Sequence, residues 1–347
     1  MRRRNSFLTV LLLGALLVLG ACGGGSEGAS GAEESSDNEV VLSYAFFAPD
    51  STFPAIQMKQ WAEELDKRTE TDVKIEMFFG GSLLEAENML DGVKNGTADI
   101  GLTATTYEPG RFPLLEISDL PSGYPNSEVA SQVVYQLVEE FEHEALEDFK
   151  IVTAFATEPS FIQSREKISN LDELKGKQLR ISGGLTPVME KLGASPVGMS
   201  QAEVPEAVQT GVIDGNISSR EVVKDFKLAE NLHYVTDFPL TVTSFVAVMT
   251  KETWESLPED VQVAIDELAP EMSQFTGAYL DKYVEEALEW AVEEHGLEIV
   301  PLEDGQADEW TKLISDIQDE AVEQANEKEL PGSEYKERLY ELVEEFK

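Results

Sequence analysis

Leu174-Lys-Gly-Lys-Gln-Leu-Arg180-Ile-Ser182 is the stretch that decides the fold of this chain. Its apolar residues predict a strand that ends by presenting one arginine to a glycine-rich turn at 182–184. Leu192-Gly-Ala-Ser-Pro-Val-Gly-Met-Ser200 and Gln209-Thr-Gly-Val-Ile-Asp-Gly215 follow it. Sheets of the α/β class place ligand groups beyond their strand ends, and an arginine there can hold a carboxylate. The pattern therefore predicts carboxylate binding at Arg180, with pairing to one of the many acidic residues as the alternative.

Strand and helix patterns alternate on both sides of this stretch. They predict strands at 40–46, 73–79, 99–104, 150–155, 178–181 and 241–249, and helices at 55–69, 83–95, 134–141, 187–192 and 204–209. Such alternation predicts a mostly parallel sheet. A long helical pattern then runs from Pro258 to Glu294, and Pro270 should kink or split it. The tail at 306–347 predicts two acidic amphipathic helices, broken near Pro331 and Gly332.

The first residues read as targeting information rather than as part of the fold. Residues 1–21 have the basic start and short apolar core of a signal peptide, and Leu19-Gly-Ala-Cys22 is similar to a lipoprotein cleavage site. We expect Cys22 to be lipidated and 22–38 to be a flexible tether. A signal-anchor helix is the alternative, although the apolar core is short for a span of about 20 residues. Cys22 is the only cysteine, so a disulfide or cysteine-based metal cluster cannot form within one copy.

Charge and size limit the function further. The net charge is −41, and cleavage before Cys22 would leave 23 basic against 67 acidic residues, or −44. This field repels nucleic acid and anionic lipid, so neither is an expected partner. It also repels an anionic ligand, which therefore needs a shielded local cation. The remaining chain of about 310 residues exceeds the usual size of a single core, so two lobes are expected.

Several further short blocks of sequence occur in a fixed order along the chain. They are Phe46-Phe-Ala-Pro49, Phe79-Gly-Gly-Ser-Leu-Leu84, Asp91-Gly-Val-Lys-Asn-Gly-Thr-Ala-Asp-Ile-Gly101, Pro109-Gly-Arg-Phe-Pro113, Asp119-Leu-Pro121 and Trp254-Glu-Ser-Leu-Pro258. Together with the central stretch they resemble the DctP-type solute-binding proteins of tripartite ATP-independent periplasmic (TRAP) transporters. The resemblance covers nearly the whole chain after the signal peptide.

The resemblance implies a fold. It is an α/β, two-lobed, periplasmic-binding-protein-like fold with a hinge, a long helix spanning both lobes and a helical C-terminus. The first lobe would comprise 39–157 and about 246–285, and the second 158–245 and about 286–347. The strand at 241–249 would lead back to the first lobe.

The resemblance also implies ligand contacts. Arg180 would pair with the substrate carboxylate, beside Ser182 in the turn. Many family members place an asparagine three residues past the glycine of Asp214-Gly215, where this chain has Ser218. Asn216, Ser218 or Ser219 could supply that hydrogen bond instead.

Other candidates come from the ends of predicted strands and the loops that follow them and, for Phe245, from the returning strand at 241–249. Aromatic side chains could hold the apolar body of a ligand or pack in the core, and hydroxyls could face the cleft. Glu158 could face the ligand or be a solvated acid. These remaining candidates are Phe46, Phe47, Thr105, Tyr107, Glu158 and Phe245.

Taken with the signal peptide, the resemblance implies a lipid-anchored extracytoplasmic protein. It would capture a small organic acid by hinge closure and deliver it to the permease subunits of a TRAP transporter. We expect it to need no cofactor or metal and to act as a monomer. The rivals are a binding component of an ATP-driven importer or sensor, and a secreted enzyme. The enzyme is disfavoured because His143, His233 and His295 lack metal-ligand spacing and no nucleophile motif occurs. The acid could be a dicarboxylate, a monocarboxylate, a 2-oxo acid, an aromatic acid or a sugar acid.

Overall fold

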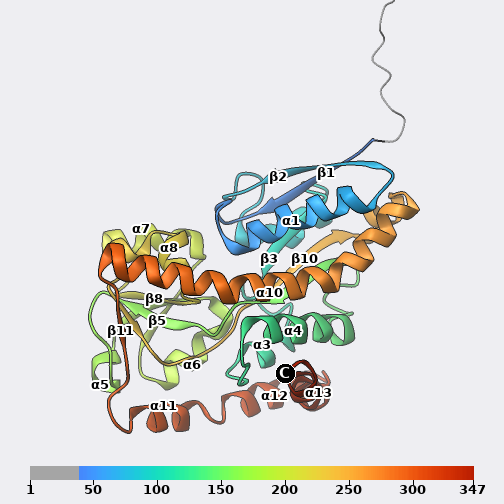
Figure 1. Ribbon diagram of the computed structural model, residues 1–347. Helices are drawn as coiled ribbons and strands as arrows, with labels where there is room; N and C mark the ends of the chain where they lie inside the picture. Colours follow the sequence, from blue (N-terminus) through green and yellow to red (C-terminus); the bar gives the residue numbers. More distant parts are fainter. Residues whose placement is uncertain (1–38) are drawn as a thin grey trace, which may run out of the picture. The chain divides into compact units, whose positions relative to one another are not determined.

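The computed structural model describes residues 39–347 (Figure 1). The signal peptide, the tether and the lipidation predicted at Cys22 lie outside the described residues. Within 39–347, none of the helices has the length and apolar character needed to cross a membrane.

The first sheet has five strands in the order β2-β1-β3-β10-β4. Their bounds are β1 Glu39–Phe46, β2 Asp72–Phe78, β3 Ile100–Ala104, β4 Phe149–Ala156 and β10 Ser244–Thr250. β1 pairs in parallel with both β2 and β3, whereas β10 runs antiparallel between β3 and β4. The carboxyl ends of β1 and β3 therefore lie at one edge, where a ligand can be held.

The second sheet has six strands in the order β11-β9-β5-β8-β6-β7. Their bounds are β5 Phe161–Ser164, β6 Gln178–Ile181, β7 Ser195–Gly198, β8 Gly215–Ser218, β9 Tyr234–Thr236 and β11 Glu298–Val300. β6 is parallel to β7 and β8, while β5 is antiparallel to β8 and β9. Among residues 39–347, four of the five strands of the first sheet run in the same direction and β10 is reversed, while five of the six strands of the second sheet do so and β5 is reversed. The prediction of a mostly parallel arrangement is therefore confirmed, and the reversed strands are the ones by which the chain enters each sheet from the other.

Short helices connect the strands. Those before the crossing to the second sheet are α1 Phe53–Arg68, α2 Met89–Lys94, α3 Leu115–Asp119 and α4 Ser127–Phe141, with single 3-10 turns at Ala86–Asn88 and Thr105–Tyr107. Those of the second sheet are α5 Leu171–Leu174, α6 Thr186–Lys191, α7 Val204–Thr210 and α8 Val222–Asp225, with 3-10 turns at Gly183–Leu185, Gln201–Glu203 and Leu228–Glu230. α9 spans Lys251–Ser256.

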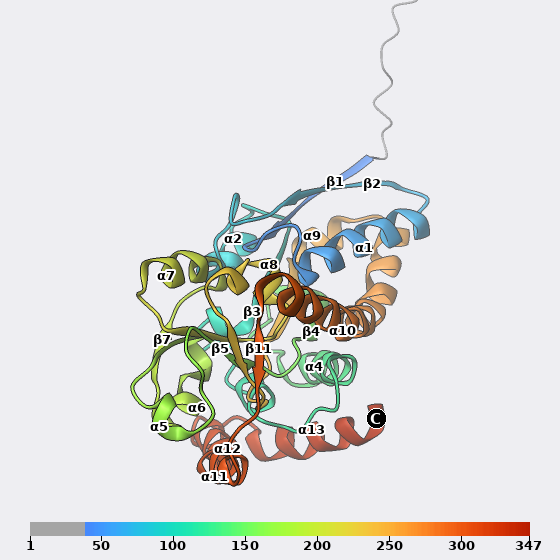
Figure 2. The same ribbon diagram turned by 60° about the vertical axis from the view of Figure 1, so that its left-hand side comes forward.

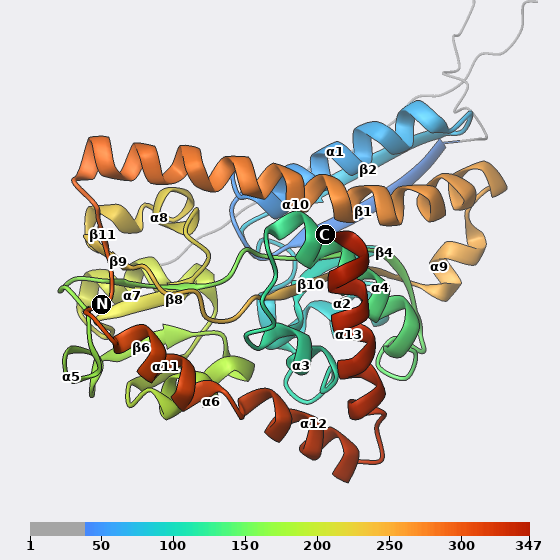
Figure 3. The same cartoon turned by 60° about the horizontal axis from the view of Figure 1, so that its bottom comes forward.

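The long helix α10 runs from Glu259 to His295 without a break. Acidic residues in its first turn favour its start, and Gly296 in the left-handed conformation ends it. It packs on α1, α4 and β4 of the first sheet and on α8 beside the second, as Figures 1 and 3 show. Pro270 does not split it, so α10 joins the two parts of the fold as expected for this architecture.

The C-terminal tail contains three helices, α11 Gln306–Ile314, α12 Ile317–Glu327 and α13 Gly332–Phe346, rather than two. The additional break at Ser315 and Asp316 carries neither glycine nor proline and so gave no signal. α12 and α13 pack on α3 and α4, along the side of the molecule seen at the bottom of Figure 2. The sequence placed 286–347 with the second lobe, but the buried side chains of α13 join the core of the first sheet.

Candidate functional site

A cavity lies where the strand ends of the two sheets meet. It holds about 480 Å³ of space not filled by atoms, part of it open to solvent. The first sheet and its loops contribute Phe46, Phe47, Phe53, Tyr107, Thr157 and Phe245. The second contributes Arg180, Ser182, Gln201, Ser218, Ser219, Glu221 and Asp225.

Arg180 lies inside β6, and its side chain is 1% exposed. Its Nε donates to the backbone oxygen of Met199 over 3.0 Å, and Nη1 donates to Gln201 Oε1 over 2.6 Å. Nη1 also reaches Asn216 Oδ1 at 3.4 Å, and Nη2 donates to the Tyr107 hydroxyl over 2.7 Å. These neutral acceptors fix the guanidinium group at the cavity wall.

The Arg180 guanidinium has no acidic partner within 4.0 Å among residues 39–347. A buried charge without a counter-ion costs several kcal/mol even after the surroundings relax. By contrast, Arg220 at the end of the same sheet is fully engaged by Glu158, at 2.8 Å between Nη2 and Oε2. The uncompensated cation in this cavity is therefore suited to an anion.

Two further donors stand beside Arg180. The Tyr107 hydroxyl oxygen accepts both from Arg180 Nη2 and from the backbone nitrogen of Gln201, at 2.7 and 2.9 Å. Its own hydrogen remains available for an acceptor. Gln201 Nε2 is buried and has no partner in the described part of the chain. Because buried polar groups are nearly always hydrogen-bonded, these donors also point to a missing acceptor.

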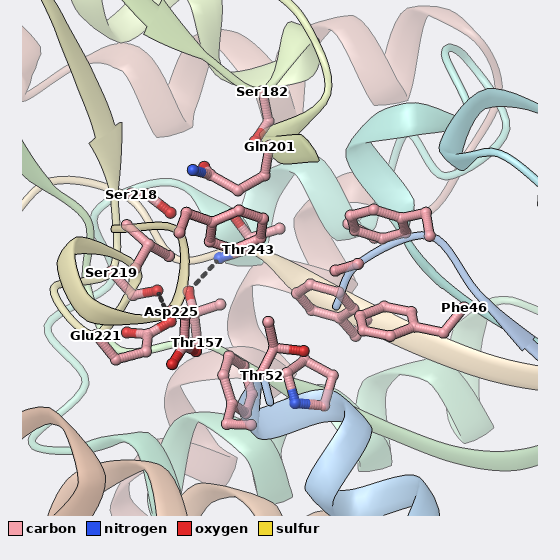
Figure 4. Close-up of a pocket in the computed structure, with 18 of the residues that line it drawn as sticks. Phe46, Thr52, Thr157, Ser182, Gln201, Ser218, Ser219, Glu221, Asp225 and Thr243 are labelled. Atoms are coloured by element: carbon pink, nitrogen blue, oxygen red, sulfur yellow. Dashed lines mark hydrogen bonds between the residues drawn. The ribbon is translucent and has the colours of Figure 1, made fainter. Parts of the chain in front are cut away.

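The opposite wall is aromatic. Phe47 contacts the Tyr107 ring edge to face, with centroids 5.2 Å apart, and Phe155 stacks on Phe245 at 5.3 Å. Phe53 packs against both members of that stack. Figure 4 shows Phe46 on this side and Ser218, Ser219, Glu221 and Asp225 on the other. The cavity can thus hold an apolar body between polar ends.

Glu221 and Asp225 are acids on the second-sheet side, the first buried and the second half-buried. The Ser219 hydroxyl donates to Glu221 Oε1 over 2.6 Å, and the Tyr283 hydroxyl donates to Asp225 Oδ1 over 2.5 Å. Burial raises the pKa of Glu221 well above its ordinary value, and the charges of Glu158 and Asp225 raise it further. Burial also raises the pKa of Asp225 to about 6.

The structure brings most of the residues selected from the sequence to this cavity. Lining it are Phe46, Phe47, Tyr107, Arg180, Ser182, Ser218, Ser219 and Phe245. Asn216 lies behind Arg180 and donates to Gln163 Oε1 over 3.1 Å. Thr105 donates to the backbone oxygen of Ser244, and Glu158 binds Arg220, so neither faces the cavity. Both side chains serve local structure, because strand-end position alone does not fix side-chain direction.

Gln201, Glu221 and Asp225 are cavity residues that sequence reasoning missed. Gln201 directly follows the Leu192–Ser200 block singled out in the sequence, and this position could have identified it. The two acids stand among 67 acidic residues, and only their position at the cavity distinguishes them. Within residues 39–347 no group of three or more His, Cys, Asp or Glu side chains is arranged to hold a metal ion.

Two sheets linked by crossing strands, with a partly open cavity between their strand ends that joins a buried arginine to an aromatic wall, define a solute-binding protein of the two-lobed periplasmic class. The model of bacterial extracellular solute-binding protein family 7, DctP, matches residues 44–325, and the chain belongs to this family.

Comparison with known proteins agrees with this membership. A TRAP periplasmic solute-binding protein from Desulfovibrio salexigens is 37% identical, with 88% of this chain and 95% of that one covered and a TM-score of 0.77. A marine-metagenome TRAP solute-binding protein specific for aromatic acids is 28% identical, with 88% and 99% covered and a TM-score of 0.84. The C4-dicarboxylate-binding periplasmic protein DctP of Rhodobacter capsulatus is 21% identical over 289 residues, or 82% of this chain and 87% of the relative.

Proposed function

We propose that this chain captures a small organic acid through its carboxylate and delivers it to the permease of a TRAP transporter. The observation that carries the proposal is the buried Arg180 guanidinium without an acidic partner in residues 39–347. A ligand carboxylate would supply the missing negative charge. It would also accept from the free hydrogens of Tyr107 and Gln201.

The ligands of similar proteins support this proposal. The marine-metagenome relative was crystallised with metahydroxyphenylacetate and with 3-hydroxybenzoate, and the Rhodobacter relative is a C4-dicarboxylate-binding protein. All of these are carboxylic acids. In this chain the aromatic wall would contact the rest of the acid, and binding rather than a covalent step would complete the task.

Domain movement would follow from the position of the site. Tyr107 belongs to the first sheet and Arg180 to the second, so an acid held by both favours the arrangement in which they meet. A ligand shifts such an equilibrium only by its higher affinity for the closed form. We propose the lobe boundaries given by the sequence, except that α12 and α13 belong to the first lobe. We also propose that Cys22 carries a lipid anchor and that the protein is a monomer.

The test is a thermal-shift screen of the purified protein against carboxylic acids and the primary amide of each. At a hundred times Kd an acid adds about 2.7 kcal/mol to the free energy of unfolding, whereas its amide should add little. Arg180→Lys should weaken acid binding by roughly ten- to a hundred-fold, because a charged hydrogen bond contributes about 1.5–3 kcal/mol.

Arg165→Lys is the matched control, since Arg165 is half-buried and does not line the cavity. It should bind acids as the unchanged protein does. Stabilisation by neutral sugars or amides, with none by their acids, would contradict carboxylate capture.

A further inference from the structure

The acidic end of the cavity contains an unsatisfied group. Glu221 is 1% exposed and lines the cavity, and its Oε1 accepts from the Ser219 hydroxyl. Its Oε2 is buried without a hydrogen-bond partner among residues 39–347. Since buried carboxyl oxygens are rarely left without a partner, this atom marks a position for a polar group of the ligand.

Asp225 reinforces the same end. It follows Glu221 by four residues, the spacing that places two side chains on one face of a helical turn. It also lines the cavity and is held by the Tyr283 hydroxyl of α10. Burial raises the pKa of both carboxyls, and the charges of Glu158 and Asp225 raise that of Glu221 further, so this end already resists negative charge.

Cations near this end are engaged elsewhere. Arg220 is held by both oxygens of Glu158 and its guanidinium lies over the Phe161 ring, 4.2 Å from the centroid. The Lys224 ammonium lies over the Tyr283 ring at 5.3 Å. Of the described residues that line the cavity, Arg180 is the only basic one. A second ligand carboxylate would therefore face two acids without a cation.

We infer that the ligand is a monocarboxylic acid that carries a hydroxyl or an amine at its far end, held by Glu221 and Asp225. The inference rests on the proposed carboxylate capture by Arg180. A hydroxyl can donate to an ionised carboxyl or accept from a protonated one, and an ammonium group favours the ionised form of both acids. Either group occupies the position beside Oε2, and the apolar middle of the ligand lies against the aromatic wall.

The test is calorimetry on the purified full chain with two matched series. One is butanoate, 4-hydroxybutanoate, 4-aminobutanoate and succinate, and the other is phenylacetate with a hydrogen, hydroxyl, aminomethyl or carboxyl group at its meta position. In at least one series the hydroxyl or amine member should bind at least ten-fold more tightly than the unsubstituted acid. The dicarboxylate should bind more weakly than the hydroxyl member and the amine member. If the dicarboxylate or the unsubstituted acid binds as tightly as the hydroxyl and amine members, the inference is overturned while carboxylate capture stays intact.

Variants then separate the two ligand groups. Glu221→Met should lower affinity for the preferred acid about ten-fold and abolish its advantage over the unsubstituted acid. Glu221→Gln keeps an acceptor oxygen, so the affinity for a hydroxy acid should stay unchanged. The affinity for an amine-bearing acid should fall as much as it does in Glu221→Met. Glu142→Gln is the matched control, because Glu142 is a buried acid outside the cavity whose Oε1 has no partner within residues 39–347.

An unchanged preference in Glu221→Met would overturn the role of Glu221. If no acid of either series binds the unchanged protein, carboxylate capture itself fails, and the inference fails with it.

Discussion

Tyr107 and Arg180 join the two sheets at the cavity, with 2.7 Å between the tyrosine hydroxyl oxygen and Nη2 of the arginine. Tyr107 ends the 3-10 turn after β3, and Arg180 lies in β6. The same hydroxyl also accepts from the backbone nitrogen of Gln201. One phenol therefore orients the Arg180 guanidinium and ties the turn after β3 to β6 and Gln201 of the second sheet.

Tyr107→Phe should weaken binding of an acid by about ten-fold, because it removes a donor to the carboxylate and a partner of Arg180. Calorimetry on the purified protein measures this change. Tyr44→Phe is the matched control, since Tyr44 is also fully buried but its hydroxyl has no partner in the described residues and does not line the cavity. Equal affinities in the two variants would show that the Tyr107 hydroxyl does not act on the ligand.

Gly277→Ala should destabilise the fold by about 1–3 kcal/mol through overpacking, despite the better helix propensity of alanine. A Cβ at Gly277 would lie 2.4 Å from the Ser127 backbone oxygen and 2.5 Å from the Glu128 Cα. Close approach here lets Asp281 accept from the first backbone nitrogens of α4, at 2.8 and 3.2 Å. Urea unfolding measures the loss, and Val263→Ala on the exposed side of α10 should stay within about 0.5 kcal/mol. A Gly277→Ala protein as stable as its parent would mean that the two helices can separate without cost.

Asp119 should make stability depend on pH. It is 1% exposed, its Oδ1 accepts from the backbone nitrogen and hydroxyl of Ser244, and burial raises its pKa to about 8. A raised folded pKa means that the stabilisation is complete below the unfolded pKa near 4 and is lost as pH rises through about 8. The expected slope is about 1.4 kcal/mol per pH unit within that window.

Asp119→Asn should reduce the measured slope between pH 5 and 8 by about this amount, because an amide cannot lose a proton there. Urea unfolding in 1 M NaCl measures it, since high salt reduces the general repulsion among surface charges. Asp66→Asn, at an exposed position on α1, should leave the slope unchanged. A slope in Asp119→Asn equal to that of the unchanged protein would assign the pH dependence to other groups.

The sequence predicted the parts of the site that local pattern determines. The strand that carries Arg180 and the glycine-rich turn after it are set by residues adjacent in the chain, and their positions agree with β6 and the turn at Gly183–Leu185. The prediction of a binding role for Arg180 rests on the resemblance and stays a proposal. Family membership followed from several ordered blocks, and the matched family model confirms it.

Contacts between distant segments were not predictable in the same way. Glu158 was expected at the ligand, but its pairing with Arg220 requires β5 to lie antiparallel beside β8. Glu221 could not be distinguished from the other acids because its burial depends on packing rather than on local pattern. The helix break at Ser315 has no glycine or proline to signal it. It arises because the side chains of α11 and α12 pack into two different hydrophobic clusters, which only the tertiary structure brings together.

Salt should stabilise this protein, because 67 acidic residues face only 26 basic ones and the repulsion among them opposes the compact state. Most ion pairs among residues 39–347 have at least one exposed partner, and pairs such as Lys94 with Asp148, in which both are exposed, lose little when screened. Raising NaCl from about 0.05 to 1 M shortens the screening length to about 3 Å, so Tm should rise. The same addition near pH 4.5, where many carboxylates are protonated, should raise Tm less. An equal rise at both pH values would show that salt acts through solvent exclusion, and that the acidic surface does not limit stability.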